Sequence, residues 1–107
     1  MKKYEVLAEK YASQIARIRH LKSLMDEATA KVRDHEKSQV NWQDDEAVAD
    51  WQRKGEDVYR AWQEADDNYK IECERLSQDI EAEYWDVPFA EPRKQGIARF
   101  WEIVRGK

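Results

Sequence analysis

The stretch VADWQRKGEDVYRAWQEADDNYKIECERLSQDIEAEY, residues 48–84, decides the fold, because its apolar residues return at steps of three and four. That spacing keeps them on one face of an α-helix. Proline is absent from the stretch, and Gly55 is its only glycine. We therefore expect one long helix over about 44–86. Its apolar face contains Val48, Trp51, Gly55, Val58, Trp62, Ala65, Tyr69, Cys73, Leu76, Ile80 and Tyr84.

A second helix is predicted before this stretch, at about residues 2–36. Its apolar residues also recur at steps of three and four, without a glycine or proline. The turn between the two helices falls at 37–43, where Ser38, Asn41 or Asp44 could cap the second helix by accepting hydrogen bonds from its first amides. The apolar face of the first helix contains Leu7, Tyr11, Ile15, Ile18, Leu21, Met25, Ala28 and Val32.

A short third helix is predicted at about residues 92–105. Pro88 and Pro92 cannot lie inside a long helix without removing hydrogen bonds, so residues 87–92 are expected to form a proline hinge. Pro92 suits the first position of the new helix, and Gly106 suits its end. The apolar face of this helix contains Ile97, Phe100, Trp101 and Val104.

Together these elements predict an all-α fold in one helical domain, residues 1–107. We expect a long, coiled-coil-like antiparallel helical hairpin with the short C-terminal helix closing its core, as a three-helix bundle or a dimeric bundle. Bulky aromatic residues on the second helix favour a homodimer that covers them, and Gly55 is expected to mark a close approach that faces a Trp, or a weak point of the helix. The third helix is expected to lie on a thin apolar face made of Ile71, Ala82 and Trp85, with Phe100 and Trp101 near Tyr4 and Leu7.

Charge is segregated along the chain although the net charge is only -4. Residues 1–37 carry nine bases and six acids, residues 38–91 carry five bases and sixteen acids, and residues 92–107 carry five bases and one acid. Pairing of a basic with an acidic helix is one explanation. Mimicry of a nucleic-acid backbone by the acidic helix is another, although bases are interleaved with its acids.

The composition also bears on compartment and chemistry. No apolar run approaches the roughly 18 residues that span a bilayer, so we expect a cytoplasmic protein without membrane contact. His20, His35 and the single cysteine, Cys73, lack the spacing of metal-ligating motifs. Activated nucleophiles and glycine-rich phosphate loops are also lacking. We therefore expect no metal, no cofactor and no catalytic residue, and hence no enzyme.

Candidate binding residues lie in three places. The predicted turn carries Val40 and Trp42 among polar residues, and Trp is enriched in binding hot spots; alternatively, Trp42 only packs on the start of the next helix. Acid pairs follow along the second helix. The third helix combines bases with aromatics, a combination that can grip nucleic acid or dock into a protein groove. The predicted partner-binding residues are Val40, Trp42, Asp44, Asp45, Asp66, Asp67, Arg93, Lys94, Arg99, Phe100, Trp101 and Arg105.

We interpret the chain as a non-catalytic adaptor or inhibitor that binds another protein. Small acidic helical proteins without site chemistry are frequent among phage and mobile-element accessory proteins that act on host machinery. From size and type, rather than from any particular residue, we expect this chain to be one of them. Two alternatives stay open. One is a nucleic-acid-binding protein or mimic, using the basic third helix or the acidic second helix. The other is a structural or assembly protein that associates only with itself.

Overall fold

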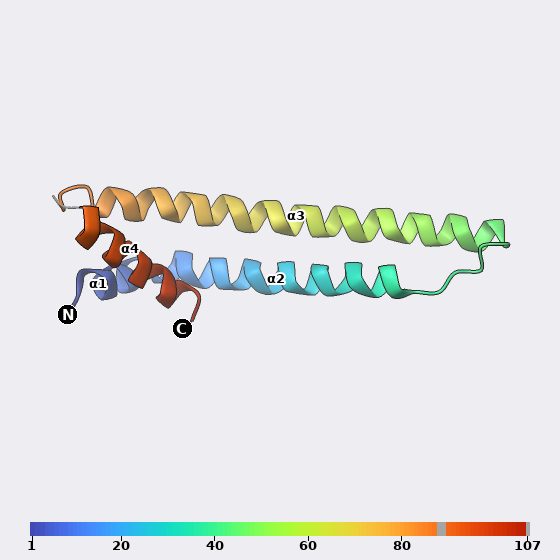
Figure 1. Cartoon of the computed structure of the whole chain (residues 1–107), viewed down its shortest axis with the longest axis horizontal. Helices are drawn as coiled ribbons and strands as arrows, with labels where there is room; N and C mark the ends of the chain where they lie inside the picture. The colour runs from blue at the N-terminus through green and yellow to red at the C-terminus, as the bar shows by residue number, and fades with distance from the viewer. Residues whose placement is uncertain (88–89, 107) are drawn as a thin grey trace. The chain divides into compact units, whose positions relative to one another are not determined.

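The computed structural model describes residues 1–87 and 90–106, and these residues form four helices and no strand. The helices are α1 (Lys3–Lys10), α2 (Ala12–Lys37), α3 (Asp45–Glu83) and α4 (Ala90–Val104) (Figure 1). The all-α helical hairpin predicted from the sequence is confirmed. The chain divides into two compact units, one made of Met1–His20 and Lys70–Lys107 and the other of Leu21–Tyr69. The single domain expected from the sequence stays a prediction.

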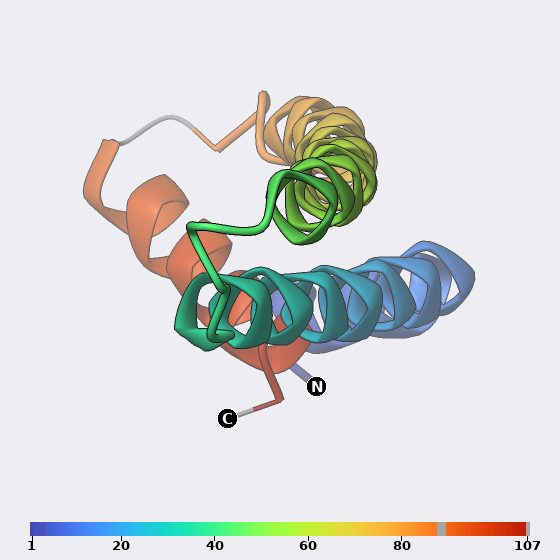
Figure 2. The ribbon, with the colours of Figure 1, turned by 90° about the vertical axis from the view of Figure 1, so that its right-hand side faces the viewer.

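The unit of residues 21–69 is a two-helix hairpin. The C-terminal part of α2 and the N-terminal part of α3 run antiparallel, and residues 38–44 connect them (Figure 2). Asp44 caps α3, because its carboxylate accepts from the amides of Glu46 at 3.0 Å and Ala47 at 3.3 Å. Between the helices, the Trp62 indole donates to the Thr29 hydroxyl at 3.1 Å. This large ring therefore finds a polar partner inside the hairpin.

Gly55 marks the close approach that the sequence suggested, but the neighbour differs from the expected one. A Cβ atom at this position would lie 2.6 Å from Nε2 of His35. The expected contact with a Trp was therefore wrong, and the small residue makes room for an imidazole ring. Gly55 itself is buried.

The unit of residues 1–20 and 70–107 holds most of the buried core. Helix α4 packs against α1, and both helices contribute buried side chains, Leu7 from α1 and Phe100 and Val104 from α4. Gly96 of α4 lies against the Tyr84 ring, since a Cβ there would meet ring atoms at 2.6–2.7 Å. The C-terminal helix therefore closes the core, as expected. The buried apolar residues of this unit are Leu7, Ile15, Ile18, Leu76, Ile80, Tyr84, Phe100 and Val104.

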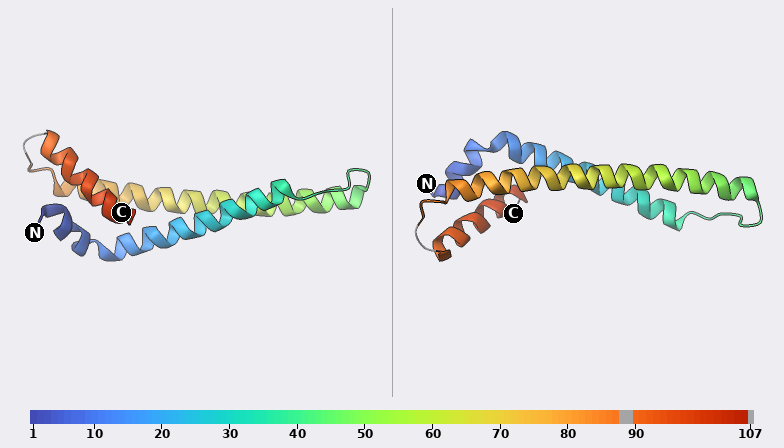
Figure 3. Two further views of the ribbon diagram at one scale, coloured as in Figure 1. Left: turned by 60° about the horizontal axis from the view of Figure 1, so that its bottom comes forward. Right: turned by 90° about the horizontal axis from the view of Figure 1, so that it is seen from above.

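The first predicted helix is divided at Tyr11, where α1 ends and α2 begins (Figure 3). Tyr11 has φ -103° and ψ 23°, and its amide still donates to the Leu7 carbonyl at 2.9 Å. Its hydroxyl donates to Glu83 of α3 at 2.9 Å. Because neither proline nor glycine lies here, we attribute the break to the packing of α1 on α4 and to this hydrogen bond.

Guanidinium groups hold both ends of α4. Arg19 donates to the carbonyls of Ile103 at 2.5 Å and Val104 at 3.1 Å, where a cation complements the negative end of the helix dipole. Arg93 donates to the Val87 carbonyl at 2.9 Å and to the Trp85 carbonyl at 3.3 Å. These contacts fix α4 at its first and last turns.

The predicted boundaries differ most around α4. Helix α3 ends at Glu83 rather than at about 86, and α4 begins at Ala90, which places Pro92 third in the helix instead of first. Prolines are tolerated throughout the first turn because those amides lack helical acceptors. Of the predicted hinge 87–92, residues 88–89, Pro88 among them, lie outside the described residues. Gly106 adopts φ 80° and ends the helix, as predicted.

The face on which α4 was expected to lie was predicted wrongly. Ile71, Ala82 and Trp85 are exposed, with 80% of Trp85 accessible. Helix α4 instead packs on α1 and against Tyr84. No helix among the described residues is both long and apolar enough to cross a membrane.

Candidate functional site

Four aromatic rings of the hairpin unit form a continuous row, which we call the aromatic row: Trp42, Trp51, His35 and Tyr59. Trp42 meets Trp51 edge to face, with centroids 5.4 Å apart and planes at 70°. Trp51 stacks on His35 at 4.6 Å and 19°, and His35 meets Tyr59 at 6.5 Å and 85°. Edge-to-face and stacked pairs of this kind are the favourable arrangements of aromatic side chains.

Hydrogen bonds fix two members of the row, Trp51 and Tyr59. The Trp51 indole donates to the Ser38 hydroxyl at 3.0 Å, and that hydroxyl donates to the His35 carbonyl at 2.5 Å. The Tyr59 hydroxyl donates to the Glu36 carboxylate at 2.6 Å, a bond that raises the pKa of Tyr59. The polar atoms of Trp51 and Tyr59 are thus satisfied within the hairpin. Their ring orientations are set before any partner arrives.

Trp42 is the more exposed end of the row, with 66% of its surface accessible, compared with 44% for Tyr59 at the other end. Its backbone belongs to the connection between α2 and α3, where the Asn41 side chain accepts from the Gln43 amide at 3.1 Å. That local bond shapes the turn around Trp42. The contact with Trp51 agrees with a role in packing on the start of α3. This contact leaves most of the ring open to solvent, so packing alone does not account for it.

The surroundings of the aromatic row are predominantly acidic. A groove of about 440 Å³ runs beside it, between Asp34 of α2 and Asp50 of α3, with Lys54 at its edge. Lys54 pairs with Asp50 at 3.6 Å, and Arg53 pairs with the same carboxylate at 2.9 Å. The acids in the last turn of α2, in the connection and in the first turns of α3 are Asp34, Glu36, Asp44, Asp45, Glu46 and Asp50.

The residues predicted at the turn divide into two groups. Val40 is half-buried and lines the groove, whereas Trp42 is exposed. Asp44 is occupied as the cap of α3, and Asp45 is exposed in its first turn. Asp66 and Asp67 lie farther along α3, half-buried and exposed respectively. The turn therefore brings together the aromatic and acidic candidates.

The predicted binding residues of α4 do not form a free aromatic grip. Phe100 is fully buried and was wrongly predicted to bind a partner, while Trp101 is half-buried and meets Phe100 edge to face at 5.7 Å. Arg93 is occupied at the start of α4, and Arg99 pairs with Glu102 at 3.2 Å. Lys94 and Arg105 are exposed.

Sequence reasoning missed three members of the aromatic row: His35, Trp51 and Tyr59. Trp51 had been assigned to the helical seam alone. His35 follows Val32 by three residues, so it continues the apolar face of α2, and this spacing could have identified it. Tyr59 lies beside the predicted apolar face of α3, and only its edge-to-face contact with His35 in the structure identifies it as a member of the row.

No group of three or more His, Cys, Asp or Glu side chains in residues 1–87 and 90–106 is placed to hold a metal ion. Comparison of the sequence with protein-family models and with curated proteins, and of the structure with solved structures, finds no match.

Proposed function

We propose that the chain is a non-catalytic adaptor or inhibitor that binds another protein through the aromatic row. The observation that carries the proposal is the exposure of Trp42 at the end of rings that are already fixed in place. Indole rings on pre-organised surfaces contribute strongly to binding, because little conformational entropy is lost when they are covered. The role expected from size and type, an accessory protein of a phage or mobile element acting on a host machine, belongs to the same proposal.

The acidic surroundings specify the chemistry of the partner. An apolar pocket that receives Trp42, ringed by Lys and Arg, complements both the indole and the carboxylates around it. Asp45 and Glu46 are exposed and lie three and four residues after Trp42. They can therefore meet basic residues at the rim while the indole is buried at the centre. Rim charges of this kind raise the association rate more than the affinity.

The cost of removing Trp42 follows from its exposed area. An aromatic side chain buries about 150–250 Å². Two-thirds of that area, at about 25 cal/mol per Å², corresponds to roughly 2.5–4 kcal/mol of possible binding energy. We therefore expect Trp42→Ala to weaken partner binding by about 50-fold to 1,000-fold.

The experiment is capture from a bacterial lysate with the tagged chain, treated with nuclease, followed by titration of the purified partner. Trp85→Ala is the matched control, because Trp85 is also an exposed tryptophan but lies outside the hairpin unit. The proposal requires a protein that Trp42→Ala loses and Trp85→Ala retains. A partner retained equally by both variants, or a captured set that disappears with nuclease, would contradict it.

Mimicry of nucleic acid by α3 is a weaker alternative, because several of its acids are paired with bases. Glu72 contacts Arg17 at 3.3 Å and Arg75 at 3.2 Å, and Asp57 contacts Arg60 at 3.4 Å. Homodimer formation and pure self-assembly are separate alternatives. Sedimentation equilibrium of the purified chain tests both, since each requires a mass above that of the monomer.

A further inference from the structure

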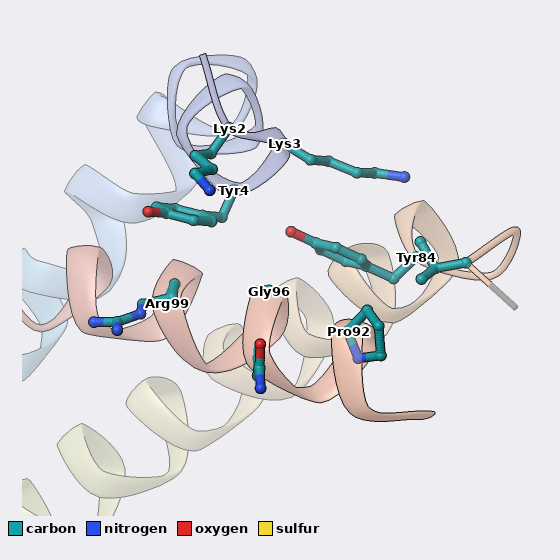
Figure 4. A pocket seen from close by; sticks show the side chains of 9 residues that line it. Lys2, Lys3, Tyr4, Tyr84, Pro92, Gly96 and Arg99 are labelled. Carbon is teal, nitrogen blue, oxygen red and sulfur yellow. The ribbon is translucent and has the colours of Figure 1, made fainter. Parts of the chain in front are cut away.

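A pocket of about 500 Å³ lies between α1, the end of α3 and α4, within the unit of residues 1–20 and 70–107 (Figure 4). Its cationic lining residues are Lys2, Lys3 and Arg99, and none of its lining residues is acidic. The lining is therefore basic, although the chain as a whole has more acids than bases, 23 against 19. The other lining residues are Tyr4, Tyr84, Val87, Pro92, Gln95 and Gly96.

Tyr84 supplies the second observation. Its side chain is 97% buried, yet its hydroxyl has no hydrogen-bond partner in the structure. Figure 4 shows the Tyr84 ring beside Gly96, with the hydroxyl pointing into the space toward Tyr4. An unsatisfied buried hydroxyl costs about 1–3 kcal/mol, so a ligand that accepts from it relieves a cost already present.

Glycine at position 96 makes this arrangement possible. Any Cβ atom there would lie 2.6 Å from the Tyr84 hydroxyl oxygen. The absence of a side chain on α4 therefore leaves room for the phenol at the pocket wall. Burial raises the pKa of Tyr84, with a further contribution from Tyr4, so the phenol stays protonated and can act as a donor.

The cations can be redirected toward a ligand at small cost. Lys3 pairs with the exposed Asp86 at 3.4 Å, and Arg99 pairs with Glu102 at 3.2 Å. Exposed ion pairs of this kind contribute at most about 1 kcal/mol. Lys3 also lies over the Tyr84 ring, 4.9 Å from its centroid, so its ammonium already sits beside the pocket.

From these features we propose that the pocket binds a small molecule that carries a phosphate group. Three cations and a buried phenol hydroxyl match the charge and the acceptor oxygens of a phosphate monoester. The volume exceeds that of inorganic phosphate and falls in the range of small-molecule sites, which leaves room for the group to which the phosphate is attached. The aromatic face of Tyr4 and the pyrrolidine of Pro92 supply the apolar walls for that group.

The test is an NMR titration of the full chain with inorganic phosphate and then pyrophosphate, at constant ionic strength, following the Gly96 amide. The key variant is Tyr84→Phe, which removes only the unpartnered oxygen. We expect it to weaken binding by about 2-fold to 10-fold. Arg99→Gln should weaken binding by at least about 10-fold. Arg105→Gln is the matched control, since Arg105 follows the same helix but does not line the pocket.

Melting curves supply an independent readout. Without anion, Tyr84→Phe should melt no lower than the natural chain, because it removes an unsatisfied group. With pyrophosphate, the natural chain should gain more stability than the variant. Absence of any shift at Gly96 up to 10 mM of either anion would overturn the proposal. Equal weakening by Arg99→Gln and Arg105→Gln would also overturn it, since it would indicate general attraction to a basic helix.

Discussion

Because Gly55 lies close to His35, we predict that Gly55→Ala destabilises the natural chain but stabilises a chain that carries His35→Ala. Alanine in a helix is more favourable than glycine by about 1 kcal/mol. At this position, however, the added Cβ would lie 2.6 Å from Nε2 and 3.3 Å from Cδ2 of His35. The imidazole cannot move without disturbing its stack on Trp51 and its edge contact with Tyr59.

The magnitude follows from these opposing effects. Overpacking costs about 1–3 kcal/mol, and loss of an aromatic pair costs about 0.5–1.5 kcal/mol. After the propensity gain of about 1 kcal/mol, Gly55→Ala should lower the free energy of unfolding by about 0.5–3.5 kcal/mol. In a His35→Ala background the obstruction is absent, so the same substitution should raise the free energy of unfolding by about 0.5–1 kcal/mol.

Urea unfolding of the four proteins, followed by circular dichroism, measures both effects as a double-mutant cycle. The expected coupling between positions 35 and 55 is about 1–4.5 kcal/mol. If Gly55→Ala stabilises the natural chain by the same amount as the His35→Ala chain, the coupling is zero. The packing of α2 against α3 at this level of the hairpin would then be wrong.

Three further substitutions test other parts of the structure. Phe100→Ala should lower the free energy of unfolding by about 3–5 kcal/mol in a thermal or urea melt, because the ring is fully buried; an effect below 1 kcal/mol would mean that α4 is not docked. Asp44→Ala should cost about 0.5–2 kcal/mol in the same assay through loss of the cap of α3, and a neutral result would contradict that assignment. Hydrogen bonds from Lys10 and Tyr11 lower the pKa of Glu83, so its stabilising effect is present above its ordinary pKa and is lost as the pH falls through the lowered value. Melts from pH 6 to pH 3 should therefore fall less steeply for Glu83→Gln than for the natural chain, and the exposed Glu81→Gln should retain the natural slope.

Helical spacing was enough to predict which residues face the interior. None of the positions assigned to the main apolar face of either long helix is exposed, because a step of three or four residues determines the side of a helix on which a residue lies. The thin second face of Ile71, Ala82 and Trp85 was the exception, since all three are exposed. The capping of α3 by Asp44 was among the predicted possibilities for the same local reason. These features depend on neighbours in sequence, so the sequence alone is sufficient for them.

Features that depend on tertiary contact were not predicted. The break at Tyr11 occurs in a segment with uninterrupted helical spacing, and its hydroxyl reaches Glu83, which is 72 residues away. The surface on which α4 packs was predicted wrongly, because the spacing of Ile71 and Trp85 suggested a second apolar face on the second helix. A helix that has two possible apolar surfaces to pack on needs the geometry of its neighbours to choose between them.

The candidate site was predicted only at its exposed end. Trp42 drew attention as a tryptophan in a polar turn, and this is a compositional signal. Trp51 contacts Trp42 and stacks on His35. In the sequence, both residues have only the spacing of ordinary apolar positions on two helices. Their relation depends on the register of α2 against α3, which periodicity leaves undetermined.

The segregation of charge along the sequence has different consequences in the two units. In the unit of residues 1–20 and 70–107, ion pairs join separate helices. Lys10 of α1 pairs with Glu83 of α3, and Arg17 of α2 pairs with Glu72 of α3. These bases belong to the N-terminal segment and these acids to α3, so the segregation directs α1 and α2 toward their acidic neighbour. In the hairpin unit, Arg53, Lys54 and Arg60 pair with acids three or four residues away on α3 itself.

Local pairs of this kind contribute only a few tenths of a kcal/mol each, and they do not select a packing partner. The acids at the connection between α2 and α3 therefore have little part in holding the hairpin together, apart from the cap made by Asp44 and the hydrogen bond that Glu36 accepts from Tyr59. The exposed surface of the Trp42 indole adds nothing to stability either, since it stays in water when the chain folds. Features that the fold does not need, and that lie together at one turn, support the proposal that a partner with complementary basic and apolar groups binds there.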